Sequence, residues 1–320
     1  MEAESKRKIS RRQFISRTGI LTASAALLPR RMSAQVPSGA KTRLILLGTG
    51  GGPRPRKSVF SSSQVIIVNN LAYVIDCGNG VAIQMARAGV PLPTLRNVFI
   101  THHHSDHNAD YGNLLLLAWA SGLQNRVNTW GPPPLARMTR LFFEMNAYDI
   151  KTRIADEGRV PFAPLIHTNE ITRGGSLMKD ENVTVSCVLV DHPPVKPAFA
   201  YRFDTHDRSI VISGDTKRSD ALIRLAQGAD VLVHEALYVP AIDRLVAKVP
   251  NAATLKQSII SHHTSVEDAG RIARAAGVKT LVLSHFVPAD DPNVTDQMWL
   301  DGARSTFKGR VIVGKDLLEI

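Results

Sequence analysis

The chain has 320 residues, 44% of them hydrophobic, so it can bury a large core in one big domain or two modest ones. Its formal net charge is +11, but residues 1–35 carry eight lysines and arginines against two glutamates. More than half of the net charge therefore lies at the N-terminus, and the remainder gives little support to a nucleic-acid partner.

The N-terminus is typical of an export signal. Residues 10–15 (SRRQFI) place paired arginines before an apolar stretch of small residues at 19–28, and the small residue Ala34 follows. We predict a twin-arginine signal peptide over residues 1–35, with the twin-arginine export machinery as a partner and a periplasmic location; a disordered basic tail is the alternative. The apolar stretch is about half of the roughly 20 residues that span a bilayer, so we expect no membrane span in the mature chain.

Strand-like and helical patterns alternate through residues 36–320. The first strand-like run ends in a turn rich in glycine and proline, and Asn69-Asn70 marks a hairpin between the next two runs. Strands are predicted at 42–48, 62–68, 71–78, 96–100, 182–190, 198–203, 209–213, 230–235, 279–285 and 310–314. Helices are predicted at 80–88, 219–227 and 266–277, and over most of 111–160 apart from a break at 127–135. This alternation, without a linker-like stretch, predicts one layered α/β domain over residues 36–320.

A cluster of histidines and aspartates follows the predicted strand at 96–100. Residues 101–110 read THHHSDHNAD, and His102, His104, Asp106 and His107 spell H-x-H-x-D-H within them. Alternate residues of an extended turn point the same way, so the first two histidines can converge on one ion while the Asp-His pair serves a second ion nearby. Imidazole and carboxylate are ligands that zinc favours, although histidine runs also occur as polar surface loops.

Three further ligand candidates follow apolar runs later in the chain. His192 lies in LVDHPPV, Asp215 in VISGDT and His285 in LVLSHFVP. Each of them alone would be read as a capping or turn residue. In a chain that already carries H-x-H-x-D-H, they supply one more nitrogen for the first ion, a bridging carboxylate, and one nitrogen for the second ion.

The ordered set of these residues, with Asp76 before them, resembles the motifs of the metallo-β-lactamase fold superfamily. The resemblance covers nearly all of residues 43–320 and is greatest to the ribonuclease Z branch. LLGTGGGPRPR resembles that branch's opening strand and turn, and IDCGNG its first acidic motif. VHEAL resembles its His-Glu-Ala-Thr motif, with Leu237 in place of the threonine, and SHHTSVEDAG its His-x-Thr segment. The resemblance implies an α/β fold of four layers, an αββα sandwich, with two zinc ions per chain.

The resemblance also implies a position for each candidate ligand. Asp215 would bridge the two ions, and Asp76 would orient one of the ligands from behind. The remaining six would bind one ion each, the first ion taking His102, His104 and His192 and the second taking Asp106, His107 and His285.

Hydrolysis needs residues that move protons as well as ligands. Two adjacent cations lower the pKa of a shared water and polarise the bond under attack, and we expect Asp106 to accept the water's proton. The family draws a proton donor for the leaving group from a Glu and a His of the VHEAL and SHHTSVEDAG motifs. Here these are Glu235 and His262, with His263 as the alternative.

The chain departs from ribonuclease Z in one respect. That branch inserts a flexible tRNA-gripping arm between the motifs matched by His192 and Asp215, and here only 22 residues separate them. The short segment and the predicted export favour an exported dinuclear zinc hydrolase. Its substrate would be a small ester-like molecule, such as a phosphodiester, sulfate ester, lactone or activated aryl compound, and not a nucleic acid. The chain could also form a homodimer. The alternatives are a ribonuclease Z-like phosphodiesterase that acts on RNA, and a non-catalytic periplasmic module that binds a metal or ligand.

Overall fold

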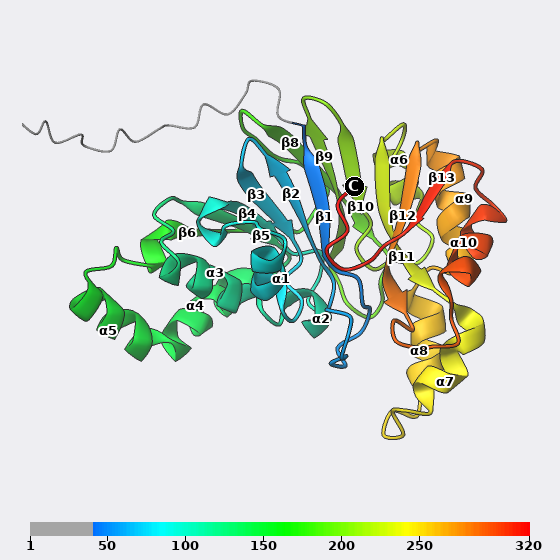
Figure 1. Ribbon diagram of the computed structural model, residues 1–320, viewed down its shortest axis with the longest axis horizontal. Helices are drawn as coiled ribbons and strands as arrows, with labels where there is room; N and C mark the ends of the chain where they lie inside the picture. The colour runs from blue at the N-terminus through cyan, green and yellow to red at the C-terminus, as the bar shows by residue number, and fades with distance from the viewer. Residues whose placement is uncertain (1–40) are drawn as a thin grey trace, which may run out of the picture. The chain divides into compact units, whose positions relative to one another are not determined.

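The computed structural model describes residues 41–320, so the predicted signal at 1–35 lies outside the described residues. The described residues form two β-sheets packed face to face, with helices on the outer side of each sheet (Figure 1). This is the four-layer αββα sandwich that the family resemblance implies.

The first sheet is built from β1 (Arg43–Gly48), β2 (Ser63–Val68), β3 (Leu71–Ile75), β4 (Leu95–Phe99), β5 (Val127–Gly131) and β6 (Ile166–Glu170). Its strands are hydrogen-bonded in chain order. The first three pair antiparallel and the last four parallel. Asn69 and Asn70, with φ of 49° and 63°, form the predicted two-residue turn between β2 and β3.

The second sheet is built from β7 (Gly175–Lys179), β8 (Val183–Val190), β9 (Ala198–Thr205), β10 (Ser209–Ile212), β11 (Val231–Leu237), β12 (Thr280–Val287) and β13 (Arg310–Val313). It runs in the order β13-β12-β11-β10-β9-β8-β7. β10 to β13 pair parallel, and β7 to β10 pair antiparallel.

Helices cover the outer faces of both sheets. On the side of the first sheet lie α1 (Val81–Arg87), α2 (Ser105–Asn108), α3 (Tyr111–Ala120), α4 (Leu135–Met145) and α5 (Ala147–Glu157). On the side of the second sheet lie α6 (Asp220–Leu225), α9 (Val266–Ala276) and α10 (Asp296–Arg304). α7 (Ile242–Val246) and α8 (Leu255–His262) form a hairpin beyond the ends of β11 and β12. None of the helices in residues 41–320 is long and apolar enough to span a membrane.

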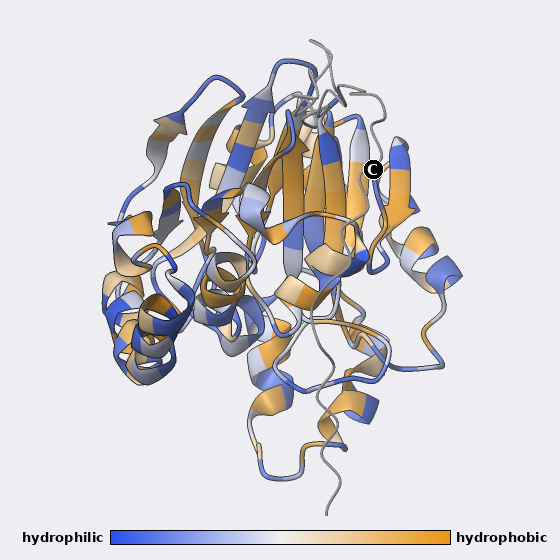
Figure 2. Ribbon diagram, turned by 60° about the vertical axis from the view of Figure 1, so that its left-hand side comes forward, coloured by the Kyte–Doolittle hydropathy of each residue, from blue (hydrophilic) through white to orange (hydrophobic). Residues whose placement is uncertain are grey.

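The core between the sheets is made of aliphatic and aromatic side chains from both. Phe99 of β4 contacts Tyr201 and Phe203 of β9, with ring centroids 5.5 and 5.2 Å apart. Figure 2 shows the hydrophobic residues concentrated on the central strands, whereas the outer helices alternate hydrophobic and hydrophilic residues. α9 is typical of these helices: Ser265 caps its N-terminus by accepting a hydrogen bond from the Asp268 N–H, and Gly277 ends it with φ of 62°.

Some elements differ from the sequence predictions. The predicted break at 127–135 begins with a strand, β5, whose residues alternate between buried and half-buried. β6, β7, α7, α8 and α10 were not predicted, because their short segments are largely exposed and lack a clean apolar period. All ten predicted strands are present.

The topology brings the carboxyl ends of many strands to one edge of the sandwich. β3 and β4 run parallel in the first sheet, and β10, β11 and β12 run parallel in the second. The segments that follow β3, β4 and β10 carry Asp76, the cluster at 101–110 and Asp215, and His285 lies near the end of β12. The rigid sheets position the loops at this edge, and such loops commonly carry functional residues.

Candidate metal centre

The histidine cluster changes from non-helical chain to helix within a few residues. His104, with φ of −93° and ψ of 150°, precedes α2, and Asp106 and His107 lie buried within that short helix. The His102 and His104 rings turn to the same side, whereas the His103 ring turns away and hydrogen-bonds a backbone carbonyl. The H-x-H-x-D-H spacing thereby brings its four named side chains to one place.

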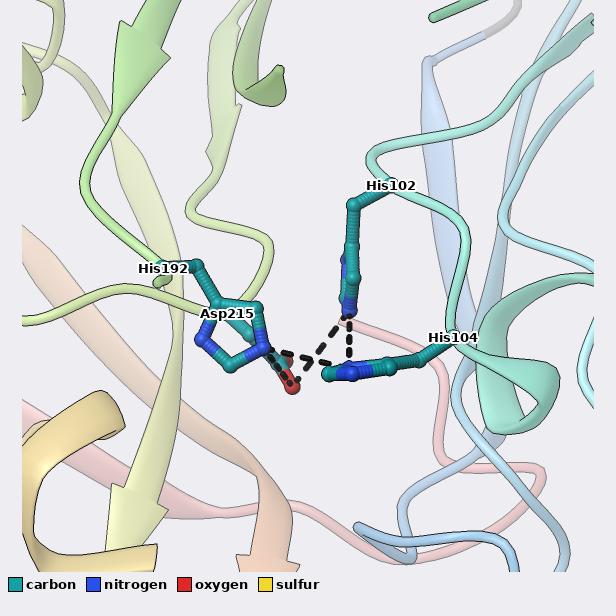
Figure 3. Close-up of side chains that lie close together, drawn as sticks. All are labelled: His102, His104, His192 and Asp215. Carbon is teal, nitrogen blue, oxygen red and sulfur yellow. Dashed lines mark hydrogen bonds and ion pairs between the residues drawn. The ribbon is translucent and has the colours of Figure 1, made fainter. Parts of the chain in front are cut away.

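The first group of candidate ligands contains three histidines and one aspartate (Figure 3). His102 Nε2 lies 3.0 Å from His104 Nδ1, and His192 Nε2 lies 3.2 Å from the same atom. Both Nε2 atoms lie 3.9 Å from Asp215 Oδ2. Three ring nitrogens and a carboxylate oxygen that face a common centre form a donor set of the kind that binds zinc.

The second group contains Asp106, His107 and His285. Asp106 Oδ2 lies 3.1 Å from His285 Nε2 and 3.6 Å from His107 Nε2. Asp215 lies between the two groups, because its Oδ1 is 3.3 Å from His107 Nε2 and its Oδ2 is 3.2 Å from His285 Nε2. The structure thus brings all seven predicted ligands together, with Asp215 where a bridging ligand would lie; their binding of metal stays a prediction.

The buried polar atoms and charges of this centre suit bound cations. His107 Nε2 and Asp215 Oδ1 are buried without a hydrogen-bond partner among the described residues, an arrangement that costs free energy unless an ion lies between them. Burial lowers the pKa of His107, but Asp215 and the other carboxylates around the ring outweigh it and raise that pKa well above its usual value. A metal ion supplies the same positive charge in place of the proton. Burial lowers the pKa of His102 well below its usual value and that of His104 to about 4, so both rings are in the neutral form that binds metal.

Groups behind the centre fix the orientation of the ligand rings. Asp76 Oδ2 lies 2.7 Å from His107 Nδ1, and Asp76 Oδ1 accepts a hydrogen bond of 2.8 Å from the Thr101 N–H. This is the orienting contact predicted for Asp76, and it leaves His107 Nε2 to face the centre. His192 Nδ1 likewise donates to the His262 carbonyl oxygen over 3.0 Å, so that its Nε2 faces the centre. Asp76 holds this place with φ of 57°, a conformation that is costly for a non-glycine residue.

The loop after β1 also supports the centre, although no role in the site was predicted for it. The Gly52 N–H donates a hydrogen bond of 2.7 Å to Asp106 Oδ2. A Cβ atom at Gly51 would lie 2.7 Å from the His285 ring, so only glycine fits this close approach. The Arg56 guanidinium donates to the carbonyl oxygens of both glycines. The glycine-rich turn GTGGGPRPR was the available signal for this contact.

The structure pairs Glu235 with His263, which corrects the predicted pairing with His262. Glu235 Oε2 lies 2.6 Å from His263 Nδ1, and Glu235 Oε1 accepts a hydrogen bond of 2.6 Å from the Thr216 N–H. His262 is the last residue of α8, and its ring centroid lies 6.2 Å from that of His192. Because the helix ends between the two histidines, their side chains lie in different places. Burial lowers the pKa of His263, but Glu235 and the other nearby carboxylates outweigh it and raise the pKa to about 9.

A pocket of about 690 Å³ opens over the centre. The candidate ligands that line it are His104, Asp106, His192, Asp215 and His285, and His263 lines it beside them. The deeper ligands, His102 and His107, are fully buried behind these residues. A substrate in the pocket therefore meets both groups of ligands and His263.

Comparisons with known proteins agree with this geometry. A family model described as the beta-lactamase superfamily domain matches residues 72–286, a span that contains all seven candidate ligands. Ribonuclease Z of Mycobacterium bovis (strain BCG) is 35% identical over 277 residues, which make up 86% of this chain and 96% of that relative. Ribonuclease Z of Mycobacterium sp. (strain KMS) is 34% identical over 274 residues, 85% of this chain and 93% of that relative.

Solved structures show the same fold. The metallo-β-lactamase fold protein YhfI of Bacillus subtilis has a TM-score of 0.65 and 20% identity, covering 87% of this chain and 98% of that one. The short form of human tRNase Z has a TM-score of 0.62 and 21% identity, covering 87% of this chain and 98% of that one. With the family model and the curated relatives, these likenesses show that the chain belongs to the metallo-β-lactamase fold superfamily of hydrolases and, within it, to the ribonuclease Z-like branch.

Proposed function

We propose that the chain is a zinc-dependent phosphodiester hydrolase of the ribonuclease Z type, with RNA as the first substrate to test. The observation that carries the proposal is the pair of ligand groups joined by Asp215, with His263 beside them in one pocket and Glu235 holding His263 from behind. Two cations about 3.5–4 Å apart are common in enzymes that cleave phosphodiesters.

The comparisons favour this function over the hydrolysis of a small ester, which was predicted from the sequence. That preference relied on the predicted export, which concerns residues outside the described part of the chain, and on the short segment between His192 and Asp215, which has no room for a tRNA-gripping arm. The mycobacterial relative named ribonuclease Z matches this chain over 96% of its own length, so the short segment does not separate this chain from proteins of that name. A ribonuclease Z-like enzyme and a hydrolase of small diesters would both cleave a phosphodiester bond, so the proposal names that reaction.

The proposed roles follow from the contacts of each side chain. His102, His104 and His192 would hold one zinc ion, and Asp106, His107 and His285 the other, with Asp215 between them. Bound zinc supplies Lewis acidity and a water of lowered pKa. Asp106, which lines the pocket, would take up the proton of that water.

The proton for the leaving group would come from His263. Its Nδ1 is held by Glu235, which leaves Nε2 as the atom that can deliver a proton into the pocket. Because its pKa is raised to about 9, the ring carries that proton at neutral pH. Pure metal binding needs no such proton donor, so the pair argues for a catalyst over a binding module.

Hydrolysis of competing substrate classes tests the proposal. Zinc-loaded protein would be assayed with a precursor tRNA, bis(4-nitrophenyl) phosphate, 4-nitrophenyl sulfate and a lactone, with the Asp106→Ala variant as the inactive control. We expect turnover of the phosphodiesters and at least a hundredfold loss in the variant, about the size of a general acid–base contribution. Turnover confined to the sulfate ester or the lactone would contradict the proposal.

A further inference from the structure

The pocket over the metal centre has two unlike sides. One side is the candidate metal centre. The other is an apolar wall supplied by the α7–α8 hairpin and the loop that joins its helices. The residues of this wall that line the pocket are Leu245, Val249, Pro250, Ala252, Leu255 and Ile259. A pocket of about 690 Å³ with one apolar side and a few polar groups is typical of sites for small organic groups.

α8 turns a single face toward the pocket. Leu255, Ser258, Ile259 and His262 line it, and positions three, four and seven residues apart lie on one side of a helix. Ile260, the neighbour of Ile259, is not among the lining residues and is 38% exposed. Ile259 also packs on a small core at the ends of β11 and β12, which fixes the hairpin against the sheet. The wall is therefore a built surface, and Ile260 provides a matched control for Ile259.

The charged groups of the pocket favour an anion. Apart from the candidate ligands and the histidines, the charged side chains that line it are Arg54, Arg56 and Lys248. The Nε atoms of both arginines are buried without a hydrogen-bond partner among residues 41–320. Arg54 is held by Asp290 at 2.7 Å, and Arg56 is 4% exposed, so both guanidinium groups are fixed in place. An anionic group with an apolar substituent thus matches both sides of the pocket.

We infer that the α7–α8 wall is a subsite for a flat, uncharged ring attached beside the scissile phosphodiester, an inference that rests on the proposed function. A ring that lies flat against Leu255 and Ile259 removes that face from water while the phosphodiester lies at the metal centre. A nucleobase of an RNA and an aryl group of a small diester share this chemistry. The wall makes Leu255 and Ile259 specificity-determining residues.

Two diesters with the same leaving group test the subsite. Phenyl 4-nitrophenyl phosphate and methyl 4-nitrophenyl phosphate both release 4-nitrophenolate and differ only in the ring. We expect zinc-loaded protein to prefer the phenyl ester in kcat/KM, and Ile259→Asn to reduce this preference about tenfold or more, since single apolar contacts are worth about that much. Ile260→Asn should keep it. Comparing the preference between variants cancels the different intrinsic reactivity of the two esters.

A second variant and a binding measurement keep the test independent of folding and turnover. Leu255→Asn changes the wall outside the small core and should act like Ile259→Asn. Calorimetry with phenylphosphonate and methylphosphonate should show tighter binding of the former, lost in both wall variants. An unchanged preference in both wall variants, or equal losses in Ile260→Asn, would overturn the subsite.

If neither diester is hydrolysed, the proposed function is wrong. The binding of the two phosphonates then still shows whether the subsite exists. An RNA that lacks the base beside the cleaved bond identifies the source of the ring. Slower cleavage of this RNA supports a nucleobase in the subsite, and unchanged cleavage, together with a retained phenyl preference, supports an aryl diester.

Discussion

His107 and His192 each use one ring nitrogen for a contact with the protein and keep the other for the centre. His107 gives Nδ1 to Asp76 and His192 gives Nδ1 to a backbone carbonyl, so the Nε2 atom of each ring faces the centre. His263 follows the same rule, with Nδ1 held by Glu235. The difference between ligand and proton donor therefore lies in what the free nitrogen faces, and variants can separate the two roles.

His263→Ala should act on the leaving group and not on the metal. An alkyl phosphodiester, whose leaving group needs a proton, should lose about 10²–10⁴-fold in kcat. A 4-nitrophenyl ester departs without much protonation and should lose far less. Parallel assays of both substrates, with zinc content measured on the same samples, check this.

His262→Ala is the matched control for that experiment. His262 lines the pocket, but among the described residues Glu235 is hydrogen-bonded to His263 and not to His262, so we expect a small effect on both substrates. A larger loss on the alkyl diester in His262→Ala than in His263→Ala would contradict the assignment.

The seven candidate ligands could be predicted from the sequence, whereas the choice between two adjacent histidines could not. The H-x-H-x-D-H spacing and the strand-end positions of the other three carry strong local signals. His262 and His263 differ only in whether they lie inside α8 or after it, and helix ends vary by one or two residues in any sequence pattern.

At the level of elements, the loop after β1 holds the second ligand group through backbone contacts. Arg56 donates to the carbonyl oxygens of Gly51 and Gly52, and Gly52 donates to Asp106. Arg56→Met should release this loop and weaken zinc affinity about 10–100-fold, the range of such supporting contacts. Chelator competition measures the affinity. Arg54→Met, which among residues 41–320 removes a hydrogen bond to Asp290 alone, should leave the zinc affinity unchanged; an equal loss in both variants would contradict the account.

Asp230 joins the starts of three parallel strands. Its Oδ2 accepts from the Ser209 N–H at 2.7 Å, and its Oδ1 accepts from Lys279 Nζ at 2.6 Å. These hydrogen bonds lower the pKa of Asp230 to about 2, and the bond from Lys279 has the largest effect. A lowered pKa in the folded state contributes stability above about pH 4 that is lost as pH falls toward 2.

Asp230→Asn should therefore lower the free energy of unfolding at neutral pH by about 1 kcal/mol, after allowance for solvent screening. The difference from the unchanged chain should shrink below pH 4. Urea unfolding at pH 7 and pH 3 measures it. Asp149→Asn, which removes an exposed ion pair within α5, is the control and should change stability by less than about 0.5 kcal/mol. A pH-independent difference for Asp230→Asn would contradict the account.

Sequence patterns predict the buried strands better than the exposed elements. β8, β9 and β12 are runs of apolar residues whose burial on one or both faces makes them recognisable. α7 and α8 bury little and were missed, although they form the apolar wall of the pocket. The element that we propose sets specificity is thus the one with the weakest sequence signal.

For the whole molecule, the fold accounts for how residues from 76 to 285 meet at one centre. The order of strands within each sheet is a non-local property that the sequence patterns do not specify, and the four-layer arrangement was expected only from the resemblance. Once the two sheets pack, their strand ends share an edge and the ligand groups face each other.

Export is a separate proposal for the whole chain, since residues 1–35 lie outside the described residues. We propose that they direct twin-arginine export, because Arg11 and Arg12 precede a short apolar stretch. Replacing both arginines by lysine should retain the protein in the cytoplasm of the expressing cell, as measured by cell fractionation. Unchanged delivery to the periplasm would argue against this route.

The central claim, that two metal ions joined by Asp215 perform the hydrolysis, is tested most directly by titrating metal-free protein with zinc while following bis(4-nitrophenyl) phosphate hydrolysis. The account predicts no turnover before zinc is added and a rise that ends at two equivalents per chain. Full turnover without metal, or a rise that ends at one equivalent, would contradict it.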